Sequence, residues 1–105
     1  MDFSFASKAL RRICEESAWA QKQLGDVVAS SLQRRLADLE ACENLSEPPP
    51  WVSIEFGESG DAAIEFHPGY WLNIVAIRGA LPMNGNQKVD WTIVDRIKLM
   101  GIQTP

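Results

Sequence analysis

Three consecutive prolines, Pro48 to Pro50, divide the chain into two halves with different hydrophobic periodicity. Proline has no backbone N–H to donate and its ring clashes with the preceding turn, so a helix cannot continue through such a run. Before the prolines, apolar residues mostly recur at helical spacing, whereas after them apolar and polar residues alternate with a period of two. The sequence therefore predicts a mainly helical half followed by a half made of strands.

The half before the prolines is expected to hold one short strand and two helices. Residues 2–6 alternate between apolar and polar side chains, which predicts the strand. Ser7 suits the N-cap of the first helix. Gly25 can end that helix in a left-handed conformation, and Asp26 can cap the next one. The second helix carries an apolar stripe at helical spacing, made of Val28, Leu32, Leu36 and Leu39.

The half after the prolines is expected to hold four strands. Residues 51–66 have the pattern of a hairpin with its turn at 57–60, and residues 70–77 form a nearly continuous apolar run typical of a central strand covered on both faces. Residues 92–102 supply the last strand, with Val94, Arg96 and Lys98 on one face. The order β-α-α-β-β-β-β predicts a single α+β domain over residues 1–105, with a two-helix hairpin packed on one face of a mainly antiparallel sheet. The expected core consists of Phe3, Phe5, Leu10, Ile13, Val28, Leu32, Leu36, Leu39, Ile54, Ile64, Leu72, Ile74 and Ile97.

The composition of the 105-residue chain limits the classes of function that it can have. Ten Lys and Arg against fourteen Asp and Glu give a net charge of −4 at neutral pH. This charge argues against non-specific binding to nucleic acid, because such binding needs a cationic surface. No apolar run approaches the roughly 18 residues of a membrane span. We therefore expect a cytoplasmic protein that does not interact with membranes.

The sequence gives little sign of metal or redox chemistry. A zinc site needs about four Cys, His or carboxylate ligands at compact spacing, and the only histidine is His67. In a reducing compartment Cys14 and Cys42 are expected to be small buried hydrophobic residues rather than a disulfide. Because no Gly-rich phosphate loop is present either, we expect no metal and no cofactor.

Three stretches of the sequence resemble the RelE/ParE/HigB superfamily of small bacterial toxins, and its HigB-like members in particular. Residues 24–47 resemble the second helix and exit loop of these toxins, with a glycine start, basic residues and leucines. Residues 65–74, which include His67 and Pro68, resemble the turn into the central strand, and residues 89–102 resemble the closing segment. Together they span nearly the whole chain, and the resemblance implies a RelE-like fold with a curled sheet.

The resemblance also implies a function. Proteins of this superfamily are the toxin components of type II toxin-antitoxin systems, and each is neutralised by a cognate antitoxin, here expected to be of the helix-turn-helix type. Many members act as ribosome-dependent mRNA interferases, in which Lys and Arg on the exposed sheet face hold phosphates and stabilise charge during cleavage. Members of the ParE branch instead inhibit DNA gyrase by binding.

The sequence departs from this family pattern at the positions that carry the chemistry. Phe56, Glu58 and Ser59 stand in the hairpin where such relatives carry Lys and Arg, and Trp71 stands where an arginine commonly begins the central strand. The chain end has no Tyr or His. Residues 44–105 contain four basic and seven acidic side chains, a net charge of −3. The catalytic residues therefore stay unknown, and the alternative is a catalytically degenerate protein-binding module on the same fold.

Two groups of residues are candidates for contact with RNA or with a protein partner. The first group, expected on the sheet, consists of Trp71, Arg78, Arg96 and Lys98. The competing interpretations are a core tryptophan, an ion pair of Arg78 with a neighbouring carboxylate, and an ordinary solvated strand face. The second group, expected to dock the antitoxin, consists of Arg11, Arg12, Arg34 and Arg35. Here the competing interpretation is a solvated helix face.

Overall fold

The computed structural model describes residues 1–46, 48–58, 60–77, 90–92 and 94–105. In chain order the elements are β1 (Asp2–Phe5), α1 (Lys8–Glu15), α2 (Ser17–Leu24), α3 (Asp26–Ala41), β2 (Ile54–Phe56), β3 (Asp61–His67), β4 (Tyr70–Ala76) and β5 (Arg96–Gln103). Among the described residues, no helix is both long enough and apolar enough to cross a membrane.

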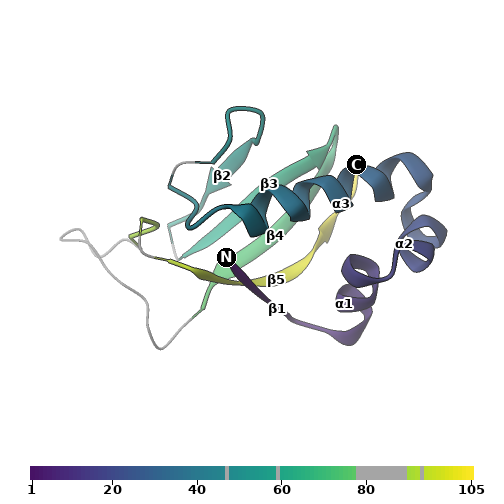
Figure 1. The fold of residues 1–105 in the computed structure, drawn as a ribbon, viewed down its shortest axis with the longest axis horizontal. Helices are drawn as coiled ribbons and strands as arrows, with labels where there is room; N and C mark the ends of the chain where they lie inside the picture. Colours follow the sequence, from purple (N-terminus) through teal and green to yellow (C-terminus); the bar gives the residue numbers. More distant parts are fainter. Residues whose placement is uncertain (47, 59, 78–89, 93) are drawn as a thin grey trace.

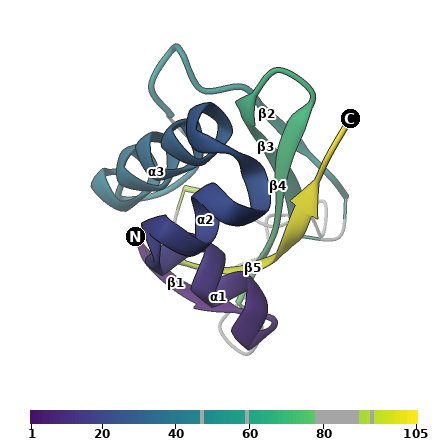
Figure 2. The same cartoon turned by 90° about the vertical axis from the view of Figure 1, so that its right-hand side faces the viewer.

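The fold has two layers, a five-stranded sheet and a layer of helices on one of its faces (Figures 1 and 2). The strand order is β1-β5-β4-β3-β2, so the first strand of the chain lies beside the last. β1 runs parallel to β5, and the other neighbouring pairs are antiparallel. An α+β class with a mainly antiparallel sheet is therefore confirmed.

The helical layer differs from the predicted hairpin because the described residues form three helices in it, and the prediction of two was wrong. Glu16 interrupts the first predicted helix with φ −111° and ψ 104°, and it serves both as C-cap of α1 and as N-cap of α2. The turn is stabilised by Arg12, whose guanidinium lies 3.8 Å from the centre of the Trp19 ring and 3.2 Å from the Glu16 carboxylate. The break lets Ala20 of α2 turn towards the interior, where it is fully buried.

The helix ends follow the predicted residues with one difference. The hydroxyl of Ser7 accepts a hydrogen bond from the amide of Leu10 at 3.1 Å, as an N-cap does. Gly25 has φ +86°, and it both ends α2 and stands at the N-cap of α3. Asp26, predicted as that cap, lies instead in the first turn, where its carboxylate faces the positive end of the helix dipole.

Two of the strands begin later than the alternation of the sequence predicts. Trp51 lies in a turn closed by the bond from the amide of Val52 to the carbonyl of Pro49, so β2 starts only at Ile54. Near β5, the amide and hydroxyl of Thr92 donate to the Asp90 carboxylate in another turn. The prediction that Val94 shares a face with Arg96 and Lys98 was therefore wrong, because Val94 precedes the strand and is buried.

The core lies between the helices and the inner face of the sheet. Every residue predicted for it is either in the buried cluster or packed against it. On β4 the buried side chains are Leu72, Ile74 and Ala76, whereas Trp71, Asn73 and Val75 on the other face are only half-buried. The prediction that β4 is covered on both faces was wrong, because among the described residues the helices cover one face alone.

Candidate functional site

The uncovered side of the sheet, here called the open sheet face, brings together the candidate residues of the strands. Side chains alternate between the two faces along each strand, so the register places one set of residues on this face. The set consists of Asp2, Ser4, Glu55, Asp61, Ala63, Glu65, Trp71, Asn73, Val75, Arg96, Lys98, Gly101 and Gln103. It has more carboxylates than cations, in keeping with the negative charge of this half of the chain.

The open sheet face carries three of the four predicted RNA- or partner-binding residues. Arg96 and Lys98 project from the same face of β5, and the guanidinium of Arg96 lies 3.9 Å from the Asp2 carboxylate with both side chains largely exposed. Trp71 lies on the same face but four residues along β4 from Val75, the residue that pairs with Lys98. At about 3.3 Å per residue this is about 13 Å, so the indole is not next to the cations. Arg78 lies outside the described residues.

A shallow hollow of about 430 Å³ lies on the open sheet face. Its floor consists of small or medium side chains, chiefly Ala63, Asn73 and Val75, and Glu55 and Met100 stand among its other walls. Met100 lies at a register shift in the pairing of β4 with β5, and its side chain is 46% exposed. Another chain can approach the sheet closely at this hollow. There Met100 offers an apolar contact and Glu55 offers a carboxylate.

The open sheet face offers no acid-base group among the described residues other than carboxylates and Lys98. The histidine, His67, instead makes a 3.0 Å hydrogen bond through Nδ1 with the hydroxyl of Ser31 on α3. The ring of Tyr70 stacks edge-on against His67 at 5.7 Å. These two rings therefore help to attach the end of the β3–β4 hairpin to a helix.

The two candidate arginines of α1 are both in ion pairs within their own helix region. Arg11 lies 3.1 Å from the carboxylate of Glu15, and Arg12 lies 3.2 Å from that of Glu16. Arg12 also covers the ring of Trp19. Exposed pairs of this kind contribute at most about 1 kcal/mol, but they reduce the positive charge available to a partner.

The two candidate arginines of α3 differ from each other. Arg35 donates to the backbone carbonyl of Glu65 at 3.0 Å and to the Asp38 carboxylate at 3.1 Å, and its side chain is only 16% exposed. Arg35 therefore links α3 to β3 through its hydrogen bond to Glu65. Asp38 also accepts a hydrogen bond from the indole of Trp51, whose side chain is 67% exposed. Arg34 is exposed and forms no ion pair with any described residue.

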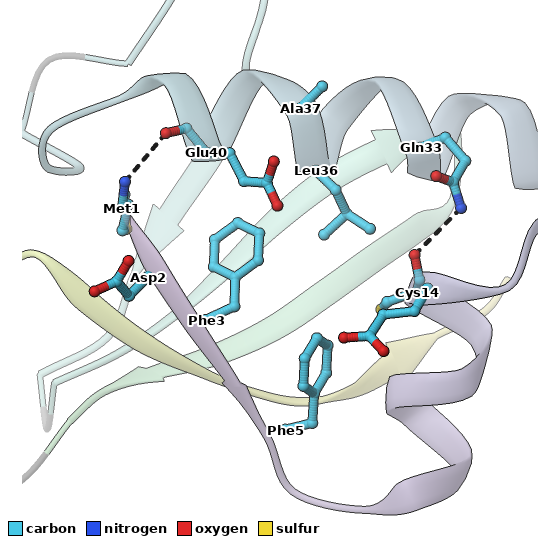
Figure 3. Close-up of a pocket in the computed structure, with 10 residues that line it drawn as sticks. Met1, Asp2, Phe3, Phe5, Cys14, Gln33, Leu36, Ala37 and Glu40 are labelled. Atoms are coloured by element: carbon cyan, nitrogen blue, oxygen red, sulfur yellow. Dashed lines mark hydrogen bonds between the residues drawn. The ribbon is translucent and has the colours of Figure 1, made fainter.

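A groove of about 550 Å³ lies between β1, α1 and α3 (Figure 3). We call it the β1 groove, and its lining consists of Met1, Asp2, Phe3, Phe5, Cys14, Glu15, Gln33, Leu36, Ala37 and Glu40. The rings of Phe3 and Phe5 point toward Leu36, and in this view the carboxylate of Glu40 lies beside the ring of Phe3. The side-chain amide of Gln33 donates to the carbonyl of Cys14 at 3.3 Å.

Sequence reasoning missed the β1 groove. The period-two alternation of residues 2–6 correctly places Phe3 and Phe5 on one face, and both side chains pack against the core. Nothing in that pattern fixes how closely α3 approaches β1, because this spacing is set by side chains distant in sequence. The one sequence feature that could have pointed to this groove is Glu40. Its carboxylate stands in the last turn of a helix, where the helix dipole favours a cation.

The cysteines are both free thiols. Burial, with a smaller contribution from the charge of Glu15, raises the pKa of Cys14 to about 12. Within the described parts of the chain, no group of three or more His, Cys, Asp or Glu residues is placed to hold a metal ion.

Cys14 is expected to resist thiol reagents in the native protein. With a pKa of about 12, its thiolate fraction at pH 8 is about 10⁻⁴, and the thiolate is the reactive form. In a Cys42→Ser variant, which keeps Cys14 alone, labelling by a chromogenic disulfide at pH 8 should be slower by at least about 10³ than after unfolding in urea. A Cys14→Ser variant is the matched control, and rapid native labelling of Cys14 would contradict its burial.

Comparison with protein-family models, with curated proteins and with solved structures finds no match to this chain.

Proposed function

We propose that this protein is a toxin-derived component of a type II toxin-antitoxin system, of the RelE/ParE/HigB type, and that it acts by binding a protein partner. The cognate antitoxin is the partner proposed first. The proposal is supported by the resemblance of residues 24–47, 65–74 and 89–102 to that superfamily. The order of a first strand, a helical layer and four further strands, with helices on one face only, is compatible with it.

The observation that carries the binding mechanism is the charge and chemistry of the open sheet face. Cleavage of RNA through its 2′-oxygen needs a proton acceptor, a proton donor and positive charge near the phosphate. Arg96 and Lys98 are the described cations of this face, and Arg96 lies near Asp2. Glu55 and Glu65 add negative charge on β2 and β3, which repels a phosphate.

The same face has features that suit a protein helix. The hollow floored by Ala63 and Val75 allows close approach. Met100 in its wall offers apolar surface, as does Trp71, two residues along β4 from Asn73 of the floor. Large apolar side chains around a small-residue floor are typical of the anchoring centre of a protein interface. We propose that an antitoxin helix lies across this hollow, with Trp71 as an anchor.

An mRNA interferase is the second candidate function. Arg96 and Lys98 favour it, because they project two residues apart from one face of a strand and so could contact an RNA backbone. In that case the proton transfers would have to come from groups other than His67 and Tyr70, which face the helical layer.

The proposed function can be tested by inducing expression of this protein, first alone and then together with the product of the adjacent reading frame. We expect the protein alone to slow growth, and the neighbouring product to relieve this effect and to co-purify with it as a stoichiometric complex. The proposal would be overturned if induction left growth unchanged and the product of the neighbouring reading frame did not bind this protein.

A further inference from the structure

We propose that the β1 groove binds an arginine or lysine side chain carried by an extended segment of a partner protein. This site goes beyond the proposed function. The groove lies on the helical side of β1, whereas the hollow proposed for the antitoxin helix lies on the opposite side of the sheet. Neither site needs the other.

The floor of the groove is aromatic and apolar. Phe3 and Phe5 present their rings to it, with Leu36 opposite (Figure 3). An aromatic ring attracts a cation placed over its face. The guanidinium of Arg11 already lies 5.9 Å from the centre of the Phe5 ring, so this ring does accept an arginine within the protein itself.

The carboxylates of the groove complement a basic side chain. Its lining includes the side chains of Glu15 and Glu40 and no arginine or lysine side chain, whereas the carboxylate of Asp2 lies on the open sheet face, 3.9 Å from Arg96. The amine nitrogen of Met1 lies at one end, where it donates to the carbonyls of Glu40 and Cys42 at 3.1 Å. Glu15 is engaged by Arg11, whereas Glu40 forms no ion pair with a described residue. The carboxylate of Glu40, drawn beside the ring of Phe3 in Figure 3, is therefore the one placed to receive a cation.

The backbone of β1 explains why the ligand is an extended segment rather than a small amine. β1 is the last strand at one edge of the sheet. The amide of Asp2 donates to the carbonyl of Asp95, and the amide of Ala6 donates to that of Leu99. Backbone groups alternate in direction along a strand, so those of Phe3 and Phe5 point away from β5. No described strand pairs with this outer edge of β1, and an unpaired strand edge can accept an added strand. A peptide segment paired with this edge could place every second side chain over the groove.

Short peptides provide a direct test on the full-length protein. The probe is a pentapeptide, acetylated and amidated at its ends, with alternating valine and threonine around one central arginine. The control peptide replaces arginine with citrulline, which has the same shape without the charge. We expect the arginine peptide to shift the ring resonances of Phe3 and Phe5 in NMR titrations with a dissociation constant of about 1 mM. The citrulline peptide should bind several-fold more weakly, and equal binding of both would overturn the proposal.

Two variants assign the binding to the groove. Glu40→Gln should weaken the arginine peptide about threefold to fivefold, as the loss of one exposed ion pair does. Glu43→Gln, an exposed carboxylate that does not line the groove, should leave binding unchanged. Phe5→Leu keeps apolar volume but removes a ring, and should weaken binding about twofold to fivefold. Equal effects of Glu40→Gln and Glu43→Gln would show non-specific attraction and would overturn the site. Because the assay uses no antitoxin and no growth readout, its failure would leave the proposed function standing.

Discussion

The Leu32→Ala variant is expected to lose about 2–5 kcal/mol of unfolding free energy. Leu32 lies in the middle of α3, is fully buried, and belongs to the same cluster as Ile64 and Leu72 of the sheet. Removing its side chain leaves a cavity that the surrounding layer cannot fill. Since a domain of this kind is stable by only about 5–15 kcal/mol in total, the loss should be plain in urea unfolding followed by circular dichroism.

Val27→Ala is the matched control on the same helix. The side chain of Val27 is 69% exposed, and an exposed substitution of this type changes stability by only about 0.5 kcal/mol or less. If Leu32→Ala cost no more than Val27→Ala, the packing of α3 on the sheet would be wrong.

If the proposed antitoxin binds the open sheet face, the Ala63→Arg variant is expected to weaken the complex with it about 100-fold or more. Ala63 forms the floor of the hollow on the open sheet face, and a long charged side chain there would occupy the space proposed for a helix. The fold should survive, because the residue beside Ala63 on the neighbouring strand is Glu55, whose carboxylate can pair with the new cation. Calorimetric titration of the purified partners measures the change.

A control for this variant is Ala18→Arg, which adds the same charge at an exposed position of α2. It should bind the antitoxin like the unmodified protein. Equal affinity of Ala63→Arg and Ala18→Arg would place the antitoxin elsewhere than on the open sheet face.

Periodicity predicted the parts of this fold that depend on local pattern. The leucine stripe of α3 and the alternation along β1, β3 and β5 assigned the buried faces, because side-chain direction follows the period of each element. The same rule placed Arg96 and Lys98 together on one face. It could not place Trp71 relative to them, since that separation depends on the register between β4 and β5.

The differences arose where tertiary contacts override local preference. The break at Glu16 follows no Gly or Pro, and it is stabilised by the stacking of Arg12 on Trp19. The late start of β5 follows from the turn in which Asp90 accepts bonds from Thr92. Similarly, the arginines of the helices could be identified as charged surface, but the attachment of Arg35 to the carbonyl of Glu65 depends on how α3 lies on β3.

Primer extension on mRNA from translating ribosomes is the most direct test of the proposal that this protein binds a partner and does not cut mRNA. Purified protein added to such ribosomes should leave the message intact, because the described part of the open sheet face offers Arg96 and Lys98 without a matched proton donor and acceptor. Each well-placed donor in an active site is worth about 10²–10³ in rate. Codon-linked cuts that disappear in an Arg96→Ala, Lys98→Ala double variant would contradict the claim and would establish these two cations as sufficient for cleavage.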